Sequence, residues 1–129
     1  MNFDKNFFTI QKFTSSELEK IKMSVKRNLE LAGSSNEPEI IFQFSYMALI
    51  KIGIYYIAKE GYRVKSQPGH HIKIIESLSK ILGSKDILIF GDKMRKDRNL
   101  DLYSGDNVIE SEETKEYLKL IESIFQKME

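Results

Sequence analysis

The stretch IIFQFSYMALIKIGIYYIA, from Ile40 to Ala58, decides the fold class of this chain. It is long enough to span a membrane, but Lys51 lies near its middle, where a charged side chain costs about 2.5–3.5 kcal/mol in a bilayer. Asn36 is expected to cap the stretch, Pro38 suits its first turn, and it runs to about Gly61. Because it is apolar on most sides, we predict a core helix that is surrounded by other helices or shared with a partner chain, and not a membrane span.

Four further helices are predicted around this one, each from apolar residues at helical spacing between capping and stop signals. No alternating stretch is long enough for a sheet, and residues 62–67 are interpreted as a basic loop. We therefore predict an all-α fold, an antiparallel bundle of four to five helices in a single domain over residues 1–129, with its core at about 15–128. The residues expected to begin the four helices are Thr14, Pro68, Ser84 and Ser111.

The composition excludes several classes of protein. The 129 residues include 20 Lys and Arg and 19 Asp and Glu, and a net charge of +1 excludes a nucleic-acid binder that relies on bulk charge. Residues 1–105 nevertheless carry +5 and residues 106–129 carry −4, so a local phosphate site remains open. Without cysteine there is no disulfide, zinc ribbon or thiol nucleophile. The N-terminus lacks a secretory signal, and we expect a cytoplasmic protein with no membrane, metal or cofactor requirement.

The segment from Met94 to Tyr103, MRKDRNLDLY, holds the main candidate site. An apolar stripe that starts earlier in the same predicted helix continues here into charged residues. Arg95 lies near Asn99 in azimuth, while Arg98 and Asp101 share a face. Arginine side chains bind phosphate oxygens in a bidentate manner, which favours a functional cleft. The alternative is an ordinary ion pair within the helix, and the spacing alone does not decide between them.

A second candidate is the pair His70 and His71, which follows Gly69 at the start of a predicted helix. The positive end of a helix keeps a histidine neutral, and a neutral histidine can act as a general base or donate a hydrogen bond. At most one of the two is expected to be functional, and the alternative is a partly buried histidine with no role in a site. Several tyrosines could stack on bases, although packing explains them better, namely Tyr46, Tyr55, Tyr56 and Tyr62.

The order of these features resembles the HEPN superfamily (higher eukaryotes and prokaryotes nucleotide-binding domain). The apolar helix is followed by Gly-Tyr-Arg at residues 61–63, a helix start with histidine, and a helix ending in Met94-Arg95-x-x-Arg98-Asn99-x-x-x-Tyr103. A last helix with an acidic start completes the resemblance, which covers about residues 15–128. It implies a small bundle of four to five helices that forms a homodimer.

In HEPN members with ribonuclease activity, an arginine, a polar residue and a histidine a few positions later form a composite site across the dimer. The resemblance assigns the first two roles to Arg98 and Asn99, whereas Tyr103 occupies the position of the histidine. A tyrosine, with a pKa near 10, is a poor general base at pH 7, although it can bind phosphate. The remaining candidates for ligand binding are Arg95, Asp101, His70 and Arg63.

The resemblance implies a protein that binds RNA or a nucleotide in a dimer cleft. Its active form would be a metal-independent endoribonuclease toxin of a toxin–antitoxin system. Two alternatives stay open. One is a binding module without catalysis that partners a small nucleotidyltransferase antitoxin, and the other is a structural helical dimer whose arginines form interface salt bridges.

Overall fold

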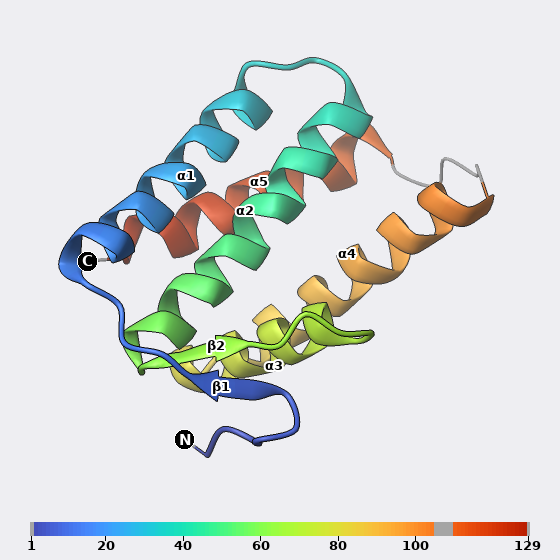
Figure 1. The fold of residues 1–129 in the computed structure, drawn as a ribbon. Coiled ribbons are helices and arrows are strands. Elements are labelled where there is room, and N and C mark those ends of the chain that lie inside the picture. Colours follow the sequence, from blue (N-terminus) through green and yellow to red (C-terminus); the bar gives the residue numbers. More distant parts are fainter. Residues whose placement is uncertain (1, 105–109, 129) are drawn as a thin grey trace.

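The computed structural model describes residues 2–104 and 110–128, and within these the side chains of all but 100–104 (Figure 1). The described part contains five helices and a small two-stranded sheet, so the predicted helical bundle is confirmed. The elements in chain order are β1 (Phe8–Ile10), α1 (Ser15–Gly33), α2 (Pro38–Lys59), β2 (Tyr62–Val64), α3 (His70–Leu82), α4 (Lys85–Ser104) and α5 (Ser111–Gln126).

Helix α2 forms the centre of the bundle. It runs antiparallel to α1, while α5 crosses behind it and α3 lies at its C-terminal end (Figure 1). Leu49 and Ile52 are fully buried on it. Among the described residues, α2 is the one helix long and apolar enough to cross a membrane, yet 61% of its most apolar window is buried inside the protein. Burial against other helices is the environment predicted for it.

The predicted helix ends are partly correct. Thr14 and Glu17 form the expected capping box, in which each side chain bonds the other's backbone N–H at 2.9–3.1 Å. The cap predicted at Asn36 is wrong, because Glu37 occupies the N-cap of α2 and makes no side-chain cap bond. The start predicted at Pro68 is also wrong. Gly69, with φ of 81°, is the N-cap of α3, and a residue with a Cβ would be strained in that conformation.

The prediction that the chain has no sheet is wrong. β1 pairs with β2 in antiparallel fashion, with Phe8 opposite Val64. Each strand has only three residues, which is too short for an alternating pattern to be recognised in the sequence. The pairing continues beyond the strands, because the Lys65 N–H donates to the Phe7 carbonyl at 2.7 Å and the Gln67 side chain donates to the Asn6 carbonyl at 3.1 Å. The N-terminal segment thus holds the loop that leads into α3.

Helices α3 and α4 pack on the bundle through two glycines. A Cβ on Gly53 of α2 would lie 2.3 Å from Cγ2 of Ile74, and one on Gly91 of α4 would lie 2.8 Å from Cγ2 of Ile75. These contacts let the three helices approach closely at one end. Met94 is fully buried, and towards its C-terminal end α4 diverges from the other helices (Figure 1). Its polar C-terminal half therefore projects beside the start of α3.

Candidate phosphate-binding site

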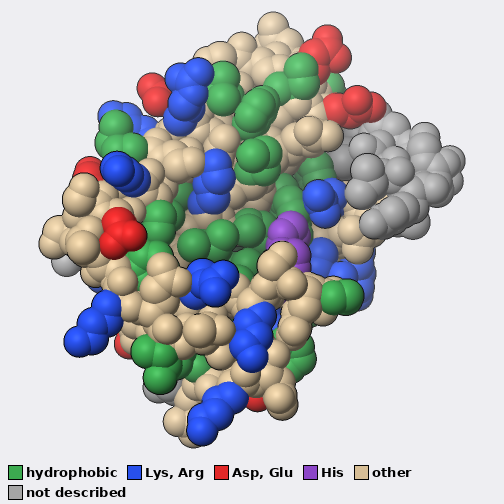
Figure 2. All heavy atoms as spheres, in the orientation of Figure 1, with side chains coloured by type: hydrophobic (Ala, Val, Ile, Leu, Met, Phe, Trp, Pro, Cys, Tyr) green, Lys and Arg blue, Asp and Glu red, His purple; other side chains and the backbone are tan. Residues whose placement is uncertain are grey.

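A cavity of about 430 Å³ lies between the start of α3 and the second half of α4. It brings together residues from the two segments that the sequence analysis selected separately. Figure 2 shows a histidine side chain at the surface of this face, with Lys and Arg side chains beside it and a hollow lined by hydrophobic side chains next to it. The residues that line the cavity are Ser66, Gln67, Pro68, Gly69, His70, His71, Ile72, Arg95, Arg98 and Asn99.

His70 is held by the turn that precedes its helix. Its Nδ1 lies 2.8 Å from the carbonyl oxygen of Gln67, and its backbone N–H donates to the same oxygen at 3.1 Å. The left-handed conformation of Gly69 makes this tight turn possible. His70 thus lines the cavity from the first position of α3, at the helix start where the sequence analysis placed it.

His71 is held by a side chain from the core. Its Nδ1 lies 2.9 Å from the hydroxyl oxygen of Tyr46, which comes from α2 and is only 2% exposed. Burial, reinforced by the nearby His70, Arg98 and Arg95, lowers the pKa of His71 to about 4. Burial also raises the pKa of Tyr46 to about 12. Both groups are therefore neutral at pH 7.

The two arginines are oriented by different contacts. The guanidinium carbon of Arg98 lies 5.6 Å from the centre of the Tyr46 ring, at the distance of a cation–π interaction. Arg95 donates from Nε and Nη2 to one oxygen of Asp92, at 3.0 and 2.8 Å. This ion pair lowers the pKa of Asp92 against the opposing effect of its burial. Arg95 therefore lines the cavity while it is paired with Asp92, a pair that the sequence analysis did not consider. The alternative that it left open, an Arg98–Asp101 ion pair, involves a side chain outside the described residues.

The structure does not bring every predicted site residue to the cavity. Arg63 lies on β2 and is exposed beside a separate, apolar hollow formed with Phe13 and Ile54. Asp101 and Tyr103 belong to the last turns of α4, and their side chains lie outside the described residues. The structural assignment of the site therefore rests on Arg95, Arg98 and Asn99 together with the histidines.

Sequence reasoning missed two parts of the site. Tyr46 was interpreted as a packing residue, because a tyrosine within an apolar helix has no pattern that marks its hydroxyl as a partner of His71. Gln67 was assigned only to a basic loop, although its carbonyl oxygen fixes His70. Both contacts join residues whose proximity depends on how α2, α3 and the N-terminal segment pack, and no local spacing encodes that.

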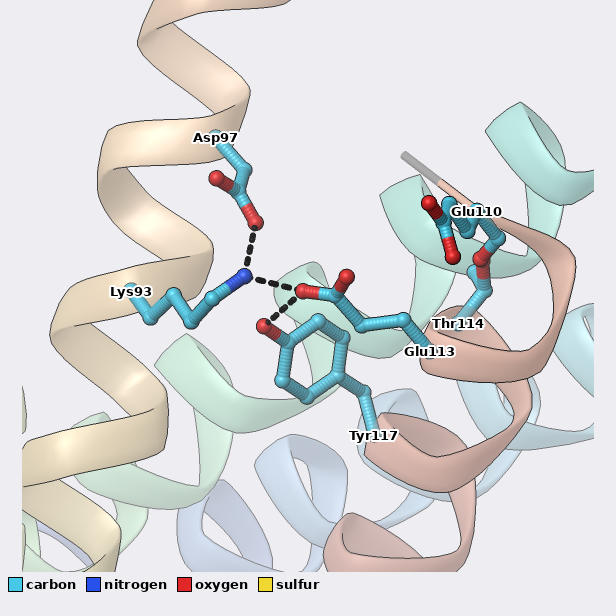
Figure 3. A network of polar contacts seen from close by, with 6 residues as sticks. All are labelled: Lys93, Asp97, Glu110, Glu113, Thr114 and Tyr117. Carbon is cyan, nitrogen blue, oxygen red and sulfur yellow. Dashed lines mark hydrogen bonds and ion pairs between the residues drawn. The ribbon is translucent and has the colours of Figure 1, made fainter. Parts of the chain in front are cut away.

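A second polar network joins α4 to α5 (Figure 3). Lys93 forms ion pairs with Glu113 and, at 3.1 Å, with Asp97, and the hydroxyl of Tyr117 donates to the same Glu113 oxygen at 2.6 Å. The Glu113 carboxylate raises the pKa of Lys93. The side chain of Lys93 is 56% exposed, so water screens its ion pairs with Glu113 and Asp97. We therefore expect these ion pairs to add little to the free energy of unfolding.

The lining of the cavity determines what it can bind. Among the residues whose side chains the structure describes, no acidic one lines the cavity, and no group of three or more His, Cys, Asp and Glu could hold a metal ion. Guanidinium groups, imidazoles and an amide instead offer hydrogen-bond donors and positive charge. No protein-family profile, curated protein or solved structure matches this chain.

Proposed function

We propose that this protein binds the phosphate group of an RNA or a nucleotide in the cavity between α3 and α4. The observation that carries this proposal is the convergence of His70, His71, Arg95 and Arg98 on one cavity, none of whose described lining residues is acidic. A group with negative charge and several acceptor oxygens complements such a lining, and a phosphate has both. Other anionic groups, such as carboxylates, offer fewer oxygens to the same set of donors.

The start of α3 adds to this preference. Its N-cap residue, Gly69, has no side chain that could cap the first turn, and the positive end of the helix dipole lies at the cavity that Gly69 and His70 line. Arg98 lines the cavity and supplies a fixed positive charge with several N–H donors, and its guanidinium carbon lies 5.6 Å from the centre of the Tyr46 ring. Phosphate binding therefore uses charge and directed donors from two helices.

The HEPN-like character and the homodimer belong to the same proposal. The helical bundle with an arginine- and histidine-containing cavity supports the first. The second is supported by α2, on which Ile40 and Met47 are 43% and 42% exposed although the helix is otherwise the core of the bundle. A second copy covering this face would remove apolar surface from water.

Calorimetric titration with a short single-stranded RNA tests the binding. We expect Arg98→Ala to weaken affinity by about tenfold or more, because hydrogen bonds to charged groups contribute roughly 1.5–3 kcal/mol. Arg63→Ala removes the same charge from a surface outside the cavity and is the matched control, expected to bind within about twofold of the wild type. Equal losses in the two variants would reduce the interaction to nonspecific charge and contradict the proposed site.

Ribonuclease activity is examined on the same samples. End-labelled RNA is incubated with wild type and with Arg98→Ala in the presence of EDTA, and the products are resolved on a denaturing gel. Cleavage by the wild type alone would support the catalytic form of the proposal, in which no metal takes part. Binding without cleavage would support the form without catalysis, including the role as partner of a nucleotidyltransferase.

A further inference from the structure

Both adjacent histidines of the cavity form a hydrogen bond to the protein through Nδ1, but the two partners differ in kind. The Nδ1 of His70 faces a carbonyl oxygen, which can only accept, so this nitrogen carries the proton and donates to Gln67. In the neutral imidazole the other nitrogen, Nε2, is then an acceptor. Among the described residues, Nε2 of His70 has no hydrogen-bond partner.

The Nδ1 of His71 faces a hydroxyl, which can donate or accept. Which of the two groups donates this hydrogen bond therefore follows from the burial of the hydroxyl. Tyr46 is almost completely buried, and among the described residues its hydroxyl has no other hydrogen-bond acceptor than His71. If His71 carried its proton on Nδ1, the hydroxyl hydrogen of Tyr46 would be buried without an acceptor, which is unfavourable. Tyr46 therefore donates to Nδ1, and the proton of the neutral His71 ring is on Nε2.

The two histidines are thus held in opposite tautomers within one cavity. Their ring centres are 4.5 Å apart, and both side chains line the cavity. His71 offers an N–H donor from Nε2, and His70 offers an acceptor lone pair from Nε2. A ligand that satisfies both has an acceptor oxygen and a hydroxyl group next to each other.

We propose that His71 donates to a phosphate oxygen and that His70 accepts from a neighbouring ribose hydroxyl, so that the site selects ribonucleotides whose phosphate is adjacent to a free hydroxyl. This inference rests on the proposed phosphate binding and specifies its substrate class. Arg98 supplies the charge for the phosphate, and Tyr46 is the positioning residue that sets the tautomer of His71. A deoxyribonucleotide lacks the hydroxyl and leaves the acceptor of His70 unpaired.

The tautomers can be observed without any ligand. Long-range proton–nitrogen correlation spectra of ¹⁵N-labelled protein at pH 8 distinguish protonated from unprotonated ring nitrogens. We expect Nδ1–H for His70 and Nε2–H for His71 in the wild type. In Tyr46→Phe, which keeps the ring but loses the hydroxyl, we expect His71 to populate both tautomers and His70 to remain unchanged. A proton on Nδ1 of His71 in the wild type would overturn the inference.

The selectivity is measured with two nucleotides that differ in one hydroxyl. Adenosine 3′-monophosphate and 2′-deoxyadenosine 3′-monophosphate are titrated into wild type at pH 8, which keeps imidazole side chains neutral. We expect the ribonucleotide to bind about three- to tenfold more tightly, the range of one hydrogen bond. His70→Asn retains an amide N–H in the position of Nδ1–H and removes Nε2, so it should bind both nucleotides alike.

His71→Gln and Arg63→Ala serve as comparisons. The glutamine amide places an N–H near the position of Nε2–H, so His71→Gln should keep a preference for the ribonucleotide, as should Arg63→Ala. Measurable but equal binding of the two nucleotides by wild type would overturn the inference and leave the proposed phosphate binding intact. Failure of wild type to bind either nucleotide or RNA would overturn the proposed function, and this inference with it.

Discussion

At the scale of single residues, His71 shows how packing sets the chemistry of the candidate site. Its ring is half-buried, bonded to the hydroxyl of Tyr46, and close to His70, Arg95 and Arg98. Burial and the neighbouring cations act in the same direction, because each disfavours a positive charge on the imidazole. The histidine therefore contributes a neutral donor at the pH where most histidines begin to titrate.

This neutrality makes stability depend on pH. The pKa of His71 is about 4 in the folded protein, whereas an ordinary histidine in an unfolded chain titrates near 6.5. Between these values the unfolded chain binds more protons, so the free energy of unfolding falls as pH is lowered from about 6.5 to about 4. Allowing for the solvent exposure of His71, we expect a loss of about 1–2 kcal/mol from this residue, measured by urea unfolding at pH 7.5 and 4.5.

The variant His71→Gln isolates this contribution. It removes the titrating group but leaves Tyr46 and the charged neighbours Arg95, Arg98 and Asp92 in place. The stability of His71→Gln should change less between pH 7.5 and pH 4.5 than that of the wild type, because all other ionisable groups titrate alike in both proteins. Identical losses in the two proteins would show that His71 titrates normally when folded.

At the scale of elements, the position of α3 depends on Gly53 of α2, a residue without a side chain. A Cβ at Gly53 would meet both Cγ2 and, at 3.3 Å, the carbonyl oxygen of Ile74, and Ile74 is itself buried in the core. The helix that carries both histidines is thus held at a distance set by this glycine. A wider spacing would shift His71 relative to Tyr46.

We expect Gly53→Ala to destabilise the protein by about 1–3 kcal/mol, the usual cost of overpacking a core, despite the better helix propensity of alanine. Gly33→Ala is the matched control, because a Cβ there meets nothing within 4 Å. It should be neutral or stabilising by up to about 1 kcal/mol. Thermal and urea unfolding measure both, and a Gly53→Ala protein as stable as the Gly33→Ala protein would contradict the close approach.

The helices could be predicted because their signals are local. Thr14 and Glu17 determine the start of α1, and Gly83, with φ of 63°, is the C-cap of α3, a position at which glycine is a common local stop signal. The strands could not be predicted, because Phe8 and Val64 become neighbours only when the α1–α2 hairpin brings β1 and β2 together. The candidate site divides in the same way, since Arg98 and the histidines stand out in the sequence, whereas their neighbour Tyr46 is selected by packing alone.

At the scale of the whole molecule, the proposed homodimer gives a direct test of the exposed face of α2. We expect the wild type to be a dimer at tens of micromolar by light scattering, and Met47→Asp to shift it towards monomer, because a buried unpaired carboxylate is strongly unfavourable. Ile89→Asp is the matched control on α4, where Ile89 is 69% exposed, and it should leave the dimer intact. A wild type that is strictly monomeric would contradict the dimer.

The N-terminal strand has a consequence for how the protein is made. On the ribosome β1 emerges first, but its partner β2 follows only after both long helices α1 and α2. The Gln67 side chain bonds Asn6, and the Gln67 carbonyl oxygen fixes His70, so the histidine end of the cavity is completed after the helical hairpin has closed. During translation the α1–α2 hairpin is therefore synthesised before any residue that lines the cavity, and the cavity is complete only after α3 and α4 have followed.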